Sequence, residues 1–257
     1  TAMRLPALVG KELTTKTWEL ALFIFAIGAF SETVIKNIEL GQVNLVLVLL
    51  IMFDTVTKAH YRGFLTGMAA GFKIVPAIFI VFMLVNRRWG DFGRALLGFL
   101  TTLAIGSFFG IGQVWQFFSV ELWDTTRVGA ADRLSNVSMY GALTRWIPGS
   151  DPVVLWAVLA ATVAAAGLAI AGFWWNHSRL VAAVVVGITG LLVSPVSWVH
   201  HWVWFIPAAC AAIALAIRAF RSSDRLVGVC LSIAAAAMVL PELGELRYAG
   251  GRLAQDS

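Results

Sequence analysis

The stretch Ser194-Pro195-Val196-Ser197-Trp198-Val199-His200-His201-Trp202-Val203-Trp204 joins two long apolar runs. It contains two adjacent histidines of the 4 in the chain, three tryptophans and a proline. An imidazole at a bilayer edge loses hydration unless it meets a ligand, a charge or water. Tryptophan favours the same edge because it has an apolar body and one N–H group. The stretch therefore predicts either a functional site at His200 and His201 or an aromatic belt with two solvated histidines.

The composition around this stretch is typical of a membrane protein. Apolar residues make up 60% of the chain and charged residues 13%, whereas a soluble domain carries about 25% charged residues. Several apolar runs are continuous and approach the roughly 20 residues with which a helix spans a bilayer. We expect an all-α, polytopic membrane protein with a single transmembrane domain over residues 1–257.

The net charge of +5 follows from basic loops, so nucleic-acid binding is not expected. Cys210 and Cys230 both lie in apolar runs, where cysteine behaves as a small hydrophobic residue. They indicate neither a disulfide framework nor a metal site.

About seven spans are predicted, and a further segment is interrupted. The spans lie near residues 18–35, 41–56, 93–110, 152–174, 180–197, 202–218 and 226–241. Residues 63–86 have basic residues on both flanks, and Gly71, Lys73 and Pro76 lie at their centre. Pro76 removes a backbone hydrogen bond, and basic flanks place both ends on the cytoplasmic side. This segment is therefore predicted to be a hairpin of two short helices.

With that hairpin, about twice as many Lys and Arg residues fall on the cytoplasmic side as on the outer side, as the positive-inside rule requires. His200 and His201 then face outward, as does the one predicted long loop, 111–150. This loop carries Trp115, Trp123, Tyr140 and Trp146 among amides and charges. It predicts contact with a sugar or a lipid headgroup, or else an amphipathic helix that lies on the bilayer.

Lys73 is a second candidate for function because a lysine at bilayer depth is costly. Its ammonium group could meet a lipid phosphate, with help from a nearby helix N-terminus. Alternatively, it extends along its own stem to water or pairs with an acid such as Asp54. Gln42 and Asn44 begin a span at the outer face, where their amides could bind a ligand or bridge neighbouring helices.

Four stretches together resemble a known family. They are GQVNLVLVLLIMFD at 41–54, GFLTGMAAGFKIVPAIFIVFMLVNRRW at 63–89, NVS at 136–138 and GLLVSPVSWVHHWVWFIP at 190–207. They resemble glycosyltransferase family 87, the polyprenol-phosphate-mannose-dependent α-(1→2)-mannosyltransferases of actinobacteria, which have the GT-C membrane fold. The chain departs from the family at Val137, where the family usually has glutamine. It also begins after the early outer loop that carries the family's catalytic aspartate, so we expect a catalytic portion to precede residue 1.

The resemblance implies an inverting transfer of mannose from a polyprenyl-phosphate donor to a cell-envelope glycolipid or lipoglycan, which forms an α-1,2 linkage. It implies a multi-pass protein of the plasma membrane, with its active side facing the periplasm or cell exterior. The expected partners are membrane lipids, the lipid-linked donor and the acceptor. No metal and no cofactor are expected, because no Asp-x-Asp metal motif is evident.

The candidate catalytic residues are His200 and His201. The candidate substrate-binding residues are Lys73, Gln42, Asn44, Asn136, Tyr140, Trp198 and Trp202.

Two other functions fit the same residues. A transporter or flippase for a lipid-linked sugar would also need an outer cavity, an intramembrane lysine and aromatic rims. An inactive remnant would bind the lipid donor without reacting. A transferase differs from both because it needs a carboxylate near the acceptor to act as general base.

Overall fold

The computed structural model describes residue 28 and residues 31–56, 60–124, 129–222 and 224–238. Within these residues the chain is helical and contains no strand, which confirms the all-α prediction. Three of the described helices are long and apolar enough to cross a membrane, or four with the bent pair α2 and α3. The count of about seven spans stays a prediction, and most of the expected span at 18–35 lies outside the described residues.

The first described helices meet at a sharp bend. Helix α2 (Glu32–Glu39) and helix α3 (Asn44–Val56) are inclined by 114°. Ser31 begins α2 because its hydroxyl accepts a hydrogen bond from the Val34 N–H group at 3.3 Å, which satisfies a donor at the helix terminus. The bend at Gly41, whose φ is +58°, places the start of α3 beside α2.

The interrupted segment forms the expected hairpin. Helix α4 (Phe64–Phe72) and helix α5 (Ala77–Val85) are separated by the turn 73–76. Each has 9 residues and is therefore about 14 Å long, too short to cross a bilayer. Arg62 precedes the hairpin and Arg88 follows it, and both bind Asp91. The two ends of the hairpin therefore lie together, with Lys73 at its tip.

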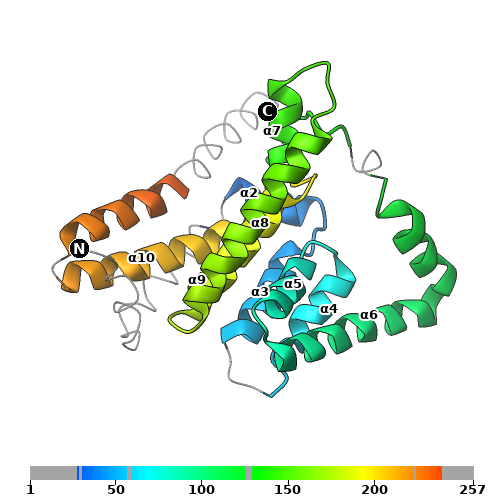
Figure 1. Cartoon of the computed structure of the whole chain (residues 1–257), viewed down its shortest axis with the longest axis horizontal. Coiled ribbons are helices and arrows are strands. Elements are labelled where there is room, and N and C mark those ends of the chain that lie inside the picture. Colours follow the sequence, from blue (N-terminus) through cyan, green and yellow to red (C-terminus); the bar gives the residue numbers. More distant parts are fainter. Residues whose placement is uncertain (1–27, 29–30, 57–59, 125–128, 223, 239–257) are drawn as a thin grey trace, which may run out of the picture.

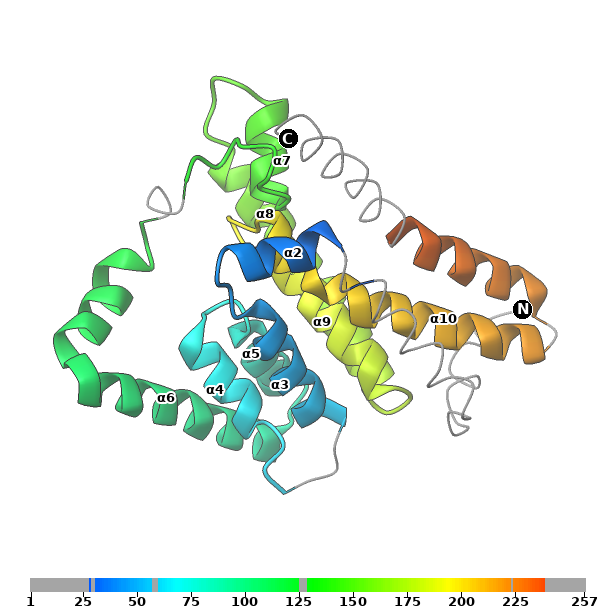
Figure 2. The same ribbon diagram turned by 180° about the vertical axis from the view of Figure 1, so that it is seen from behind.

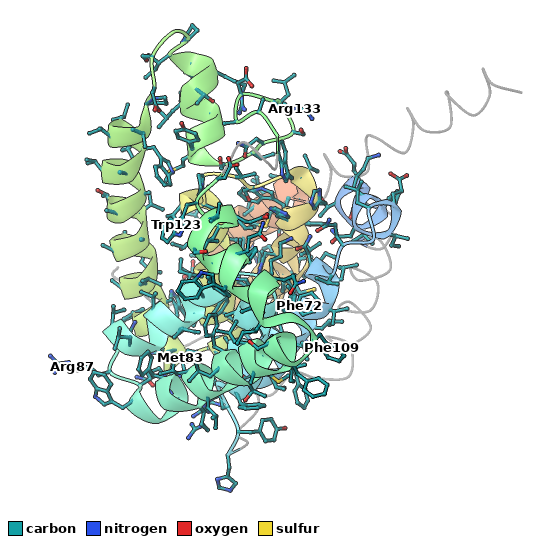
Figure 3. The ribbon with its side chains drawn as sticks, turned by 90° about the vertical axis from the view of Figure 1, so that its right-hand side faces the viewer. Phe72, Met83, Arg87, Phe109, Trp123 and Arg133 are labelled. Atoms are coloured by element: carbon teal, nitrogen blue, oxygen red, sulfur yellow. The ribbon has the colours of Figure 1, made fainter. Side chains whose placement is uncertain are left out.

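Helix α6 (Trp89–Gln116) lies along the hairpin and then leaves it (Figure 1). It packs closely against α4 because Gly67 and Gly98 face backbone atoms of Ala95 and Phe64, where a Cβ would collide. Beyond a kink at Gly110, helical structure continues through the π-helical turn η2 (Phe117–Glu121). Figure 3 shows Phe109 near this end of α6, and its side chain is exposed.

The prediction of a loop over all of 111–150 is therefore wrong for residues 111–121. At Gly110 the backbone leaves helical geometry, with φ 180° and ψ 87°, and a second helical segment begins after it. Helix α7 (Met139–Trp146) interrupts the rest of the predicted loop.

The centre of the molecule is a helical pair. Helix α8 (Val153–Trp175) and helix α9 (Arg179–Val193) run side by side (Figures 1 and 2). The chain then continues in extended form to the 3-10 helix η4 (Val199–Trp204), which leads into helix α10 (Phe205–Arg221). A shorter apolar helix, Arg225–Met238, follows. The expected span at 180–197 thus ends early, at Val193, before Pro195.

The buried core joins α3, α5, α8, α9 and η4. Ile51, Phe82, Val186 and Val203 are at its centre. Phe79 stacks on Trp204 with ring centroids 5.5 Å apart. This packing holds the beginning of α3, the hairpin tip and η4 at one end of the bundle.

Candidate functional site

Lys73 is positioned by the break between α4 and α5. Its backbone is extended, with φ −145° and ψ 127°, so the chain leaves α4 at this residue. Its Nζ donates to Asn44 Oδ1 at 2.7 Å and to Gln42 Oε1 at 3.3 Å. An ammonium group has three donors, and these two amide oxygens accept from it without neutralising its charge.

The alternative that Lys73 pairs with Asp54 is wrong. Asp54 Oδ2 accepts hydrogen bonds from Gly63 N, Thr66 N and Thr66 Oγ1 at 2.8, 3.1 and 2.6 Å. This carboxylate therefore caps the first turn of α4, where Gly63 has no side chain to do so. Acids are stabilising at that position because the N-terminus of a helix carries partial positive charge.

His201 is the third partner of Lys73. Its Nε2 lies 3.2 Å from Lys73 Nζ, and the backbone N–H of Trp198 donates to its Nδ1 at 3.3 Å. A neutral imidazole accepts at only one ring nitrogen, so it cannot accept from both donors at once. The contact between Lys73 and His201 is consequently one that an incoming hydrogen-bond acceptor can replace.

A network of buried amides supports this centre. Asn37 Nδ2 donates to His200 O at 2.6 Å, and Asn44 Nδ2 donates to the same carbonyl at 3.0 Å. Asn44 Nδ2 also donates to Asn37 Oδ1 at 3.0 Å. These bonds hold η4 against α2 and α3, and they orient the oxygen of Asn44 toward Lys73.

Asn37 is a site residue that sequence reasoning missed. It lies between Lys36 and Ile38 in a short polar helix, and that position predicts a surface residue. One signal was available, because Thr33 and Asn37 are four residues apart and therefore share a face of α2. Both side chains are buried, and Asn37 Nδ2 donates to Thr33 O at 2.8 Å.

His200 contributes differently from His201. Its backbone carbonyl receives the two amide bonds, and its half-buried ring meets the ring of His201 edge-on at 4.5 Å. The structure thus brings together Lys73, Gln42, Asn44 and both histidines, all of which the sequence singled out.

Asn136 lies on the segment that pairs with 195–198, not beside Lys73. Its Nδ2 donates to Ala131 O at 2.9 Å and to Pro195 O at 3.3 Å. Its Oδ1 accepts from Ser197 N at 2.9 Å and from Ser138 N at 3.3 Å. An asparagine side chain has two donors and two acceptor positions, so Asn136 has no capacity left for a substrate. Its hydrogen bonds hold the extended segment that leads into η4.

Of the aromatic candidates, Tyr140 has its own partners. Its hydroxyl donates to Asp151 Oδ1 at 3.1 Å, and its ring meets Trp156 edge-on. Burial raises the pKa of this hydroxyl, and Asp151 raises it further, so it remains a donor at neutral pH.

The two tryptophan candidates flank the histidines. Trp198 pairs through its backbone with Asn136. Trp202 packs against the core, and within the described structure its buried Nε1 has no hydrogen-bond partner.

A cavity of about 30 Å³ lies at the centre, lined by polar and apolar groups that include Asn44, Lys73, Pro76, His201 and Trp204. A space of that size holds about one water molecule, so a sugar would require the surrounding segments to move. Within the described residues, no group of three His, Cys, Asp or Glu side chains is placed to hold a metal ion.

A family model and several curated proteins match this chain. The model of glycosyltransferase family 87 matches residues 2–195. No solved structure matches the chain.

Three curated relatives are similar over most of the chain. A polyprenol-phosphate-mannose-dependent α-(1-2)-phosphatidylinositol mannoside mannosyltransferase of Mycolicibacterium smegmatis is 34% identical over 88% of the chain and 55% of its own length. The protein of that name in Mycobacterium tuberculosis is 31% identical over 75% of the chain and 46% of its own length. A phosphatidylinositol pentamannoside mannosyltransferase of M. smegmatis is 33% identical over 73% of the chain and 46% of its own length. The chain therefore spans about half the length of the relatives that it matches.

Proposed function

Because this chain belongs to glycosyltransferase family 87, we propose that it acts in a membrane mannosyltransferase. The donor is a polyprenyl-phosphate mannose, and the acceptor is a phosphatidylinositol mannoside or a related lipoglycan of the cell envelope. The new linkage is α-1,2. The relatives' names support this choice of donor and acceptor.

The observation that carries the proposal is the position of Lys73. Its ammonium group lies at the hairpin tip, its charge is not neutralised by the amides of Gln42 and Asn44, and its contact with His201 is replaceable. A phosphate oxygen of the donor takes the place of that contact, and Lys73 and His201 then both face the phosphate. Charged donors suit a phosphate that gains negative charge as it leaves.

In the reaction, an acceptor hydroxyl attacks the anomeric carbon of mannose, and the bond from that carbon to the phosphate oxygen breaks. The electron pair leaves with the polyprenyl phosphate, while a carboxylate removes the hydroxyl proton. We assign Lys73 and His201 to the phosphate and assign no general base within the described residues. Asn37 and Asn44 position these groups.

We place this centre within the plasma membrane, facing its outer side. The bias of Lys and Arg toward the opposite loops supports that orientation. The sugar and the acceptor headgroup would then lie outside, while the lipid tails lie between helices.

The test replaces Lys73 with methionine, which keeps most of the side-chain volume and removes the charge. We expect K73M to raise the donor KM about tenfold or more, because a charged hydrogen bond is lost. Lys36→Met is the matched control, since Lys36 is exposed and pairs with Glu39. The assay uses membranes that contain the protein, labelled polyprenyl-phosphate mannose and a phosphatidylinositol mannoside acceptor.

An unchanged donor KM in K73M would remove Lys73 from the phosphate site. Wild-type membranes that bind the donor but form no product sensitive to an α-1,2-mannosidase would contradict the transferase. That result would favour the donor-binding or flippase function instead.

We also propose that no metal ion takes part. Transfer is expected to proceed at the same rate in EDTA as in added Mg²⁺ or Mn²⁺, because two nitrogen donors of the protein face the phosphate. Loss of activity in EDTA that Mn²⁺ restores would show that a metal is required.

A further inference from the structure

Three guanidinium groups gather around one indole at the opposite end of the bundle. The Cζ of Arg88 lies 4.1 Å from the ring centroid of Trp175, and those of Arg179 and Arg62 lie at 5.9 and 6.0 Å. Trp175 is buried and ends α8, while Arg179 begins α9. A cation over an aromatic face is attracted by the ring, but three cations also repel one another.

The neighbouring carboxylates offset this charge only in part. Asp91 binds Arg62, Arg88 and Arg94 at 3.3, 2.8 and 2.6 Å. Asp54, the next acid in this part of the described structure, is held by the backbone and hydroxyl of α4. Among the described residues, four arginines therefore share this end of the bundle with two carboxylates.

Two of these arginines, Arg88 and Arg179, line a cavity of about 500 Å³, which is large enough for a headgroup. Arg88, Trp175, Ser178 and Arg179 contribute to its polar wall, and Val56 and Leu180 to its apolar wall. The cavity is at the start of α9, whose 15 residues separate it from the Lys73 centre by about 22 Å. It is therefore a separate site.

The positive-inside rule by itself explains arginines at this end of a membrane protein, but not their convergence. Arg87 illustrates this point. Like Arg88 it follows α5, but its side chain projects away from the bundle (Figure 3). Arg88, the next residue, turns inward over Trp175. Val85 and Trp89, on either side of this pair, are 55% and 61% exposed, so apolar surface adjoins the basic residues.

We propose that the cavity between Arg88, Trp175 and Arg179 binds a phosphate group, and that the adjoining apolar surface favours the headgroup of an anionic phospholipid as its source. Planar guanidinium groups pair with phosphate oxygens through two parallel hydrogen bonds. The exposed Val85 and Trp89 are placed to contact the acyl chains. This site does not depend on the proposed transfer reaction.

The test measures lipid binding to the full chain purified in a neutral detergent. The probe is fluorescent dioleoylphosphatidylglycerol, and the comparison lipid is phosphatidylcholine with the same chains. We expect tighter binding of phosphatidylglycerol, and a loss of about tenfold in R179Q, since a charged hydrogen bond is removed. R87Q is the matched control, with the same change of charge outside the cavity, and it is expected to bind like the wild type.

R179K keeps the charge without the planar fork and is expected to lie between the wild type and R179Q, which guards against a folding defect in R179Q. Equal binding of both lipids, or equal affinity in R179Q, R179K and R87Q, would overturn the proposal. Inorganic phosphate is added as a competitor. If millimolar phosphate displaces the lipid, the cavity is a phosphate site whose occupant is a soluble phosphate. If it does not, the result supports a phospholipid headgroup as the occupant.

Discussion

At the scale of single residues, His200 and His201 have different surroundings although they are adjacent in the chain. The ring of His201 reaches Lys73 and the Trp198 N–H group, whereas His200 contributes its carbonyl to Asn37 and Asn44. The two rings meet edge-on with centroids 4.5 Å apart, and it is Nε2 of His201 that lies 3.2 Å from Lys73 Nζ. We therefore expect them to differ in function.

H201A is expected to lower the rate of mannosyl transfer about a hundredfold, as loss of a donor to a developing negative charge does in other enzymes. H200A keeps the backbone carbonyl and is expected to lower it less than tenfold. The measurement is turnover in membranes, normalised to the amount of inserted protein. Equal losses in the two variants would contradict separate roles.

At the scale of elements, the hairpin α4–α5 holds Lys73 at the centre of the site, and α6 holds the hairpin. Gly67 permits the contact because its Cα faces the backbone of Ala95, where a Cβ would collide. Small residues allow such close approach between membrane helices. The position of Lys73 therefore depends on the contact between α4 and α6, although neither helix contributes another residue to the site.

G67A is expected to destabilise the protein by about 1–3 kcal/mol, because the extra methyl group forces α4 and α6 apart. The melting temperature in detergent should fall, and the donor KM should rise as Lys73 moves. G93A is the matched control, since a Cβ at Gly93 in α6 meets nothing within 4 Å. A melting temperature for G67A equal to that of G93A would show that the contact is not tight.

At the scale of the whole molecule, the two ends of the bundle have different chemistry. One end holds Lys73, His201 and the amides, and the other holds the arginines around Trp175 and Asp91. Helices α3 and α9 each run from one end to the other. If the arginine end is cytoplasmic, as the charge bias predicts, the Lys73 centre faces outward.

This orientation can be tested with single cysteines in a background that lacks Cys210 and Cys230. L134C lies beside the Asn136 segment, where Leu134 is 86% exposed, and it should react with an impermeant maleimide in intact cells. R87C should react only after permeabilisation. The reverse pattern would place the Lys73 centre in the cytoplasm and contradict the proposed orientation.

Much of this arrangement was predictable from local sequence. The apolar runs indicated helices in a membrane, and Pro76 with its basic flanks indicated the hairpin. Lys73 and His201 were identified because such side chains are costly in an apolar stretch. By contrast, the loop expected from residue 111 onward begins with a further helical segment, which follows the break at Gly110.

The sequence by itself determined the helical class, the break at Lys73–Pro76 and the residue types available for phosphate chemistry. These follow from local properties, namely hydropathy, the missing N–H of proline and the charge of side chains. Only the tertiary structure decided that Asn37 supports the centre through a bond to a residue 163 positions away. Likewise, only the tertiary structure gives every hydrogen-bonding position of the Asn136 side chain a partner within the protein, and only it places three arginines around Trp175. Such contacts depend on which helix faces pack together, and that is a property of the whole chain and of no single segment.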